Sequence, residues 1–251
     1  MRFRLASTFI VAAAAAFASQ AATAAPVKNI VLVHGAFVGG SGWRPVYDIL
    51  THDGYNVTLV QEPLTSFAED VAATQRILAM QNGPTILVGH SYGGAIITEA
   101  GNDPHVAGLV YIAAHALDNG ETEAINGKKF PNAAHPFAKT PDGFLYINPV
   151  NFPSDFAADL PLKQAEFEAK AQMLTSASVF TANIPDPAWK VKPSWYMVAK
   201  ADKIINPDLE RMYAKRAHSH TVEIAGASHS VYESHPKEVA ALIEQAALGA
   251  K

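Results

Sequence analysis

A serine in a glycine-rich turn is the first candidate for chemistry in this chain. Ser91 stands in the pattern Gly-His-Ser-Tyr-Gly at residues 89–93, a G-x-S-x-G sequence that follows the apolar run of residues 85–88. Residues 95–100 read as the start of a helix, so the serine would lie on a sharp strand-to-helix turn. Such a turn exposes the hydroxyl and aims backbone N–H groups at the atom it attacks. The pattern predicts that Ser91 is a nucleophile.

A serine hydroxyl is a weak nucleophile at neutral pH and needs a base within hydrogen-bond reach. In a parallel α/β sheet, the reacting groups lie beyond the carboxyl ends of the strands. Of the ten histidines, His229 follows the last predicted strand, residues 221–224, and we predict that it is the base. His115 follows the predicted strand at residues 106–113, but it precedes every candidate acid, so it is interpreted as a possible pocket residue.

A carboxylate must orient the histidine. Asp202 follows the predicted strand at residues 194–198 and gives the chain order serine, aspartate, histidine, so it is our preferred candidate. Asp118 and Glu121 follow the strand at residues 106–113 and are alternative acids at the same end of the sheet.

Acyl transfer passes through an oxyanion, which preorganised N–H donors stabilise. We predict two donors: the backbone N–H of Tyr92, directly after the serine, and that of Ala36, in the glycine-containing loop after the first strand. Aromatic and apolar side chains near the serine would bind the substrate. The predicted substrate-binding residues are Phe37, Phe144, Tyr146, Phe152 and Met173.

Short β-branched runs alternate with helical stretches in most of the chain. This alternation predicts a parallel sheet covered by helices on both faces. A capping box at Ser66 and the Asn206-Pro207 pair mark two helix starts. The strands are predicted at residues 29–33, 55–60, 85–88, 106–113, 194–198 and 221–224.

The alternation stops after Ala114. Residues 116–192 hold eight of the sixteen prolines and most of the phenylalanines, with one clear helical stretch at residues 161–174. Disordered segments are poor in aromatic residues. We therefore predict an ordered cap insertion at about residues 116–192, folded over the strand ends.

The composition is that of a globular protein, with 49% hydrophobic and 17% charged residues in a chain of 251. The formal net charge is −4, and no run of lysine or arginine occurs, which argues against nucleic acid as a partner. The chain has no cysteine, which excludes thiol chemistry and disulfide bonds.

The N-terminus has the pattern of a targeting segment. Arg2 and Arg4 precede an apolar stretch at residues 5–17, and Ala-Thr-Ala at residues 22–24 is a cleavage site. The stretch is shorter than the roughly 20 residues that a membrane span needs. We predict a cleavable signal peptide over residues 1–24 and a single domain over residues 25–251, located in the periplasm or secreted, without a stable membrane anchor after cleavage.

In combination, four segments resemble the α/β-hydrolase superfamily: residues 31–35, 89–94, 202–203 and 226–229. The resemblance covers essentially all of the predicted mature chain and is greatest to the small-esterase and hydroxynitrile-lyase-like branch that includes plant methylesterases. It implies an α/β-hydrolase fold with a sheet of about six parallel strands, helices on both faces and a cap. It also implies hydrolysis of a small-molecule ester with neither metal nor cofactor.

Two departures from that branch bear on the reaction. Hydroxynitrile lyases of this kind typically have a lysine and a threonine where this chain has Ser230 and Gly35, and both differences favour an esterase. The sequence predicts a serine hydrolase that cleaves a small or medium carboxylic ester or lactone through an acyl-enzyme on Ser91. The alternatives are a hydroxynitrile-lyase-like or C–C-cleaving enzyme with the same residues, and a non-catalytic ligand-binding protein with this fold.

Overall fold

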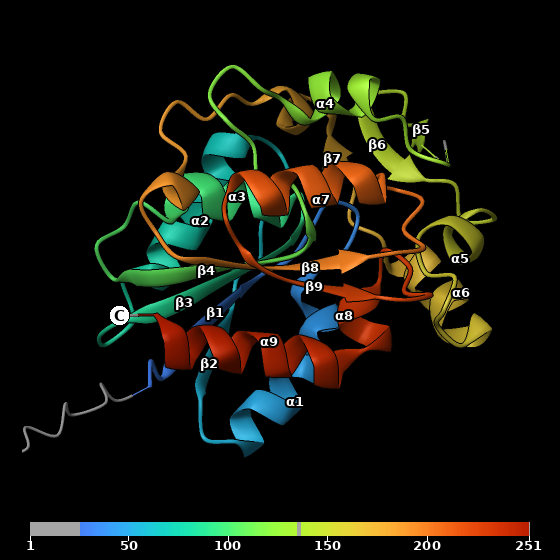
Figure 1. Ribbon diagram of the computed structural model, residues 1–251. Helices are drawn as coiled ribbons and strands as arrows, with labels where there is room; N and C mark the ends of the chain where they lie inside the picture. Colours follow the sequence, from blue (N-terminus) through green and yellow to red (C-terminus); the bar gives the residue numbers. More distant parts are fainter. Residues whose placement is uncertain (1–25, 135–136, 251) are drawn as a thin grey trace, which may run out of the picture.

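The computed structural model describes residues 26–134 and 137–250 (Figure 1). The signal peptide predicted at residues 1–24 lies outside the described residues. Within the described residues, no helix is both long enough and apolar enough to cross a bilayer.

The main sheet has six strands, all parallel, in the order β2-β1-β3-β4-β8-β9. This confirms the predicted parallel sheet of about six strands. The strands are β1 (Asn29–Val33), β2 (Asn56–Leu59), β3 (Thr85–Ser91), β4 (Val106–Ala114), β8 (Ser194–Ala199) and β9 (His220–Ile224).

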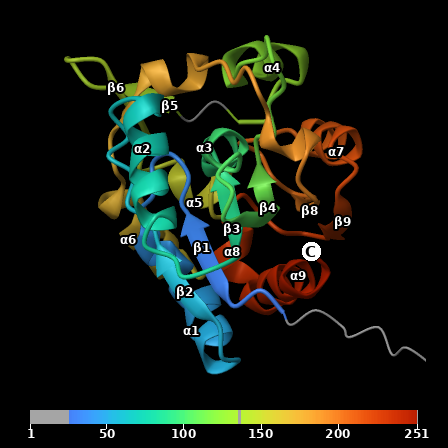
Figure 2. The same ribbon diagram turned by 90° about the vertical axis from the view of Figure 1, so that its left-hand side faces the viewer.

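Helices cover both faces of the sheet (Figures 1 and 2). On one face lie α1 (Arg44–His52), α8 (Val231–Ser234) and α9 (Pro236–Gly249). On the other lie α2 (Phe67–Leu78), α3 (Gly93–Ala100) and α7 (Pro207–Arg216). The short 3-10 helix η1 (Gly40–Trp43) precedes α1.

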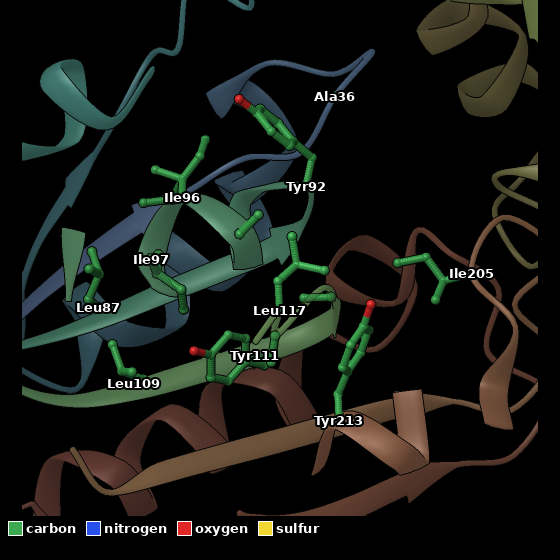
Figure 3. Packing of buried hydrophobic residues seen from close by; sticks show 14 of the residues in the cluster. Ala36, Leu87, Tyr92, Ile96, Ile97, Leu109, Tyr111, Leu117, Ile205 and Tyr213 are labelled. Atoms are coloured by element: carbon green, nitrogen blue, oxygen red, sulfur yellow. The ribbon is translucent and has the colours of Figure 1, made fainter. Parts of the chain in front are cut away.

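The strands are apolar on both sides because both faces are buried. Along β1, Ile30 and Leu32 pack into the core on the α9 side, and Val31 and Val33 pack into the core on the α3 side. Successive side chains of a strand point to opposite faces, so the sheet divides the interior into two cores. Figure 3 shows part of the core on the α3 side, where residues of β3, β4 and α3 meet.

Two predicted helix starts are confirmed in atomic detail. Ser66 is the N-cap of α2, and its hydroxyl accepts a hydrogen bond from the backbone N–H of Glu69 at 3.3 Å. Asn206 caps α7 by accepting from the N–H of Asp208 at 2.9 Å, with Pro207 at the first helical position. α7 follows the loop that carries Asp202, so its cap fixes one end of that loop.

The chain between β4 and β8 forms a small structure of its own, which we call the cap segment (residues 115–193). Its three short strands make an antiparallel sheet in the order β5-β6-β7, which we did not predict. The predicted helix at residues 161–174 corresponds to α6, and α5 and α6 lie beyond the arrowheads of β8 and β9 (Figure 1). The elements are α4 (Glu123–Lys129), β5 (Phe137–Lys139), β6 (Phe144–Ile147), α5 (Phe152–Asp155), α6 (Leu162–Ala171), β7 (Thr175–Ser176), η2 (Ala177–Thr181) and η3 (Ala188–Lys190).

Candidate active site

Ser91 is the last residue of β3, and α3 begins two residues later. Its φ angle is +54°, in the left-handed region that side chains other than glycine rarely adopt. The flanking glycines allow this turn because there is no room for side chains. A Cβ on Gly89 would lie 2.5 Å from the carbonyl oxygen of Gly93, and a Cβ on Gly93 would lie 2.6 Å from that of His34.

This close packing gives a first prediction. We expect Gly93→Ala to lower the free energy of unfolding by about 1–3 kcal/mol, because the added methyl group must displace backbone. Urea denaturation followed by circular dichroism measures the change. Gly127→Ala is the matched control, since a Cβ there would meet no described atom within 4 Å apart from its chain neighbours and the backbone of its own helix. Equal stabilities of Gly93→Ala and wild type would contradict the packing argument.

Three side chains from three separate loops or strand ends form a hydrogen-bonded chain. His229, in the loop after β9, has its Nε2 2.8 Å from the Oγ of Ser91 and its Nδ1 2.5 Å from Oδ2 of Asp202. Asp202 follows β8, and its Oδ1 accepts from the N–H groups of Ile204 at 2.7 Å and Ile205 at 2.9 Å. With Asp202 accepting from Nδ1–H, Nε2 is left to accept the proton of the serine hydroxyl.

The two alternative acids have other partners. Asp118 pairs with Lys190 at 2.5 Å, and Glu121 pairs with Arg216 at 2.7 Å. Partial burial raises the pKa of Asp118, but Lys190 and the N–H of Asn119 outweigh that effect and hold the pKa below its ordinary value. Among the three carboxylates considered from the sequence, Asp202 is the one that the structure brings to His229.

The buried imidazole of His90, next to Ser91, also stabilises the turn. His90 donates from Nε2 to the carbonyl oxygen of His229 at 2.9 Å, and its ring packs on that of Tyr232 with 4.4 Å between ring centroids. Burial, together with the nearby His229, lowers the pKa of His90 well below its ordinary value. A neutral His90 therefore fixes the backbone of His229 without placing a second charge beside it.

Two backbone N–H groups remain available beside Ser91. Within the described residues, neither Ala36 nor Tyr92 donates its N–H to another atom. The next donor along the loop, the N–H of Phe37, binds Oγ1 of Thr175 at 3.1 Å, and the carbonyl oxygen of Phe37 accepts from the N–H of Met173 at 3.1 Å. The loop after β1 is thus attached on both sides of residue 37 to the cap segment.

Buried polar groups also stabilise the loop after β1 and the turn at Ser91. The hydroxyl of Tyr92 donates to Asp70 at 2.7 Å, and the N–H of Leu64 donates to the same carboxylate at 2.8 Å. Burial raises the pKa of Asp70, although both donors oppose the rise. His34 lies beside Glu62 at 2.9 Å; burial lowers the pKa of His34, but Glu62 outweighs that effect and the pKa is raised.

A cavity of about 200 Å³ lies next to Ser91. Phe37, a predicted substrate-binding residue, lines this cavity, and so does Ala36, a predicted oxyanion donor. Most of its other walls are apolar and come from the cap segment and the loop after β8. They are Glu123, Ala124, Gly127, Phe130, Asn132, Phe137, Leu145, Phe156, Phe180, Ile204, Ile205, Asn206 and Leu209, with His115 after β4.

The other four predicted substrate-binding residues, Phe144, Tyr146, Phe152 and Met173, do not line this cavity. Phe152 is fully buried and stacks on Phe156 with 4.7 Å between ring centroids, so Phe156 faces the cavity in its place. Met173 packs against the core on the α3 side of the sheet, near Gly39. Phe144 and Tyr146 are partly exposed residues of β6. The expected pocket wall is corrected to these other aromatic residues.

The sequence did not single out Glu123, which the structure places in the cavity wall near His115. The carboxyl Oε2 lies 3.2 Å from Nε2 of His115. The only local signal is Thr122, whose hydroxyl caps α4 and thereby fixes Glu123 as the first helical residue. That signal marks a helix start, and it does not indicate that the side chain of Glu123 faces the cavity. No set of three or more potential metal ligands gathers anywhere in residues 26–134 and 137–250.

The model of the alpha/beta hydrolase family matches residues 30–242. The chain belongs to the alpha/beta hydrolase family. This alpha/beta hydrolase is 27% identical over 250 residues to a pyrethroid hydrolase from Sphingobium wenxiniae, a match that covers 86% of each chain. A shorter match, 33% identical over 110 residues, is to a carbendazim hydrolyzing esterase from a Nocardioides species and covers 38% of this chain and 46% of that protein.

Solved structures have the same fold. A pyrethroid hydrolase from Sphingobium faniae superposes with a TM-score of 0.76 at 24% identity, over 89% of this chain and 98% of the other. A methylesterase from Arabidopsis gives a TM-score of 0.74 at 19% identity, over 88% and 98%. The predicted α/β-hydrolase fold is confirmed. The family match and the esterase and hydrolase relatives also support a carboxylic ester hydrolase with a small-molecule ester as substrate.

Proposed function

We propose that the chain hydrolyses a small or medium carboxylic ester or lactone through an acyl-enzyme on Ser91. The Oγ of Ser91 attacks the carbonyl carbon while Nε2 of His229 takes the hydroxyl proton. Asp202 orients the imidazole and stabilises its charged form. The N–H groups of Ala36 and Tyr92 bind the oxyanion.

The second half of the reaction uses the same groups. His229 delivers its proton to the leaving alcohol, and the C–O bond to that alcohol breaks to leave the acyl group on Ser91. A water molecule then gives a proton to His229 and attacks the acyl carbon, and His229 returns the proton to Ser91 as the acid leaves. No step requires an electron acceptor or donor.

One observation carries this proposal: the hydrogen-bonded chain from Ser91 to Asp202 opens into a largely apolar cavity. The serine hydroxyl and the imidazole are 2.8 Å apart, which is within reach for proton transfer. Ser91 itself lines the cavity, so an ester bound there would meet the nucleophile. The two unused N–H groups lie on the residues that family members use for the oxyanion.

The test of this proposal is hydrolysis under metal-free conditions. We expect protein dialysed against EDTA to hydrolyse p-nitrophenyl acetate and butyrate as fast as undialysed protein, since every proposed role belongs to a side chain or a backbone N–H. A fluorophosphonate should label Ser91 and abolish the hydrolysis. Loss of activity on chelation, restored by added metal, would refute the metal-free mechanism. Absence of labelling would favour a non-catalytic ligand-binding protein.

The lyase alternative meets a steric obstacle at Gly35. A Cβ on this residue would lie 2.8 Å from the Cβ of Ser91, so a threonine cannot be placed here without moving the nucleophile. Cyanohydrin cleavage assayed beside ester hydrolysis separates the two reactions; faster cyanohydrin cleavage would favour the lyase.

We also propose that residues 1–24 direct export and are then removed. The support is the sequence pattern of two arginines, an apolar stretch and a small-residue site. Mass spectrometry of the protein from cell fractions should find a chain that begins at Ala25 outside the cytoplasm. A full-length chain in the cytoplasm would contradict this.

A further inference from the structure

Glu123 is a buried carboxyl group that the proposed reaction does not use. It is 8% exposed, begins α4 of the cap segment and lines the cavity that contains Ser91. One of its oxygens, Oε1, is buried without a hydrogen-bond partner among the described residues. The other, Oε2, lies 3.2 Å from Nε2 of His115. A buried polar atom without a partner is costly, so its presence in a ligand cavity needs an explanation.

Attachment of the cap does not explain Glu123, because Glu121 already has that role two residues earlier. Both oxygens of Glu121 bind the guanidinium of Arg216 on α7, at 2.7 and 2.9 Å. Oε2 of Glu121 also accepts from Nδ2 of Asn126 and from the N–H of Asp118, each at 3.0 Å. A carboxylate that anchors the cap is thus fully satisfied by protein donors, whereas Glu123 is not.

The surroundings of Glu123 are apolar. The cavity walls include five phenylalanines, and Phe37 lies 5.6 Å from Phe137 and 5.9 Å from Phe180 between ring centroids. Such walls accommodate an apolar ligand and provide few hydrogen bonds. A single carboxyl group among them therefore has a large effect on which ligands fit, because a ligand that supplies its missing partner removes the cost of the unpaired atom.

The protonation of the pair suits hydrogen bonding to a neutral group. Burial raises the pKa of Glu123 to about 8. Burial, together with His229, lowers the pKa of His115 to about 3. At pH 7 the pair therefore has no net charge, and Glu123 has a proton to donate. His115 is held from its other side by the hydroxyl of Tyr213, 3.3 Å from Nδ1.

We propose that Glu123 is a specificity-determining residue whose carboxyl group hydrogen bonds to a second, uncharged oxygen of the substrate. The enzyme then selects apolar esters that carry such an oxygen, a ketone or an ether for example, away from the bond that is cleaved. This inference rests on the proposed function, because it assigns a substrate class to the cavity of Ser91.

The test uses two pairs of esters with matched shapes. In p-nitrophenyl 4-oxopentanoate and p-nitrophenyl pentanoate, a ketone replaces a methylene in the acyl group; in acetonyl butyrate and isobutyl butyrate, the difference lies in the alcohol. For at least one pair, the ratio of kcat/KM for the ketone to kcat/KM for its alkyl counterpart should be above one in wild type. Glu123→Leu should lower that ratio of kcat/KM values by about tenfold, the effect of one hydrogen bond, and Glu123→Gln by less than about threefold. Glu121→Gln, the matched control, should lower stability and leave the ratio unchanged.

Three results would overturn the inference. The first is a ratio close to one in wild type for both pairs, and the second is a ratio that Glu123→Leu does not change. The third is the absence of both hydrolysis and fluorophosphonate labelling in wild type, which refutes the proposed function itself and this inference with it. Hydrolysis of the alkyl esters without preference for the ketones refutes only the role of Glu123.

A pH profile keeps the inference testable if Glu123→Leu fails to fold. Above about pH 8, Glu123 ionises and puts a negative charge in the wall of the same apolar cavity in which the oxyanion forms, so kcat/KM of wild type for p-nitrophenyl pentanoate should fall. The titratable neighbours of Glu123 are His115, Tyr92 and Tyr213, and Tyr213 in turn lies near the Glu121–Arg216 pair. Glu123→Gln cannot ionise and should remove this fall. An identical fall in both proteins would overturn the inference.

The pH dependence of thermal unfolding measures the protonation of Glu123 independently of catalysis. Below pH 4.5, the ordinary pKa, Glu123 is protonated in both the folded and the unfolded chain. Between pH 4.5 and about 8 only the unfolded chain releases this proton, so this residue makes the folded state less stable as the pH rises. The Tm of Glu123→Gln relative to wild type should therefore increase from pH 5 to pH 8. A constant difference would show that the carboxyl group is already ionised in the folded protein and would overturn the inference.

Discussion

Ser91→Ala should lower kcat for p-nitrophenyl butyrate by about 10⁶-fold, the effect of removing the nucleophile from a serine triad. The oxyanion donors and the cavity remain in this variant, so weak catalysis above the rate in water should survive. Ser230→Ala is the matched control, because Ser230 is also buried and its hydroxyl has no partner among the described residues. Activity of Ser91→Ala within tenfold of wild type would exclude the acyl-enzyme.

The conformation of Ser91 adds a second readout to the same experiment. Its φ of +54° strains any residue with a Cβ, and glycine relieves this strain. We expect Ser91→Gly to be as inactive as Ser91→Ala but more stable than it by about 1 kcal/mol. Differential scanning calorimetry of the two variants measures this difference. Equal stabilities would show that the turn holds the nucleophile without strain.

Asp202→Asn should lower kcat by about 10⁴-fold while the protein stays folded. The N–H groups of Ile204 and Ile205 both donate to Oδ1, so they select the oxygen of an asparagine amide for that position. The NH₂ group then faces Nδ1 of His229 and donates to it. This places the proton of the imidazole on Nε2, which can no longer accept a proton from Ser91.

Asp118→Asn is the control for the loss of a negative charge. Its ion pair with Lys190 is partly exposed, so the free energy of unfolding should change by less than about 1 kcal/mol and kcat by less than about twofold. Steady-state kinetics of both variants decide between the two acids. Near-normal turnover of Asp202→Asn together with collapse in Asp118→Asn would reverse the assignment.

The features predicted correctly from the sequence are those in which neighbouring residues define the structure. The turn at residues 89–93 is such a feature, because glycines, strand and helix are contiguous. The capping box at Ser66 is another. The positions of the six strands along the chain and the loop positions of Asp202 and His229 followed from the regular alternation of strand and helix.

The cap segment was predicted less well because its side chains can face either the cavity or the interior of the cap. Phe152 and Phe156 are one helical turn apart and have the same chemistry, yet only Phe156 lines the cavity. The position of Glu123 depends on its contact with His115 and on the hydrogen bond that ties Asn126 of α4 to Tyr213 of α7, which residues near it in the sequence do not specify. Strands β5 and β7 have three and two residues, too few for a visible period of two.

The two hydrogen bonds at residue 37 limit how this enzyme could be recombined with its relatives. Its N–H is held by Thr175 and its carbonyl by the N–H of Met173, while the neighbouring Ala36 carries a proposed oxyanion donor. A chimera that exchanged residues 115–193 alone would replace both hydrogen-bond partners of Phe37 and so alter how the loop with the proposed oxyanion donor is held. The two segments must therefore be exchanged together. A working chimera would take residues 34–38 and the cap segment from the same parent, although the two are far apart in the sequence.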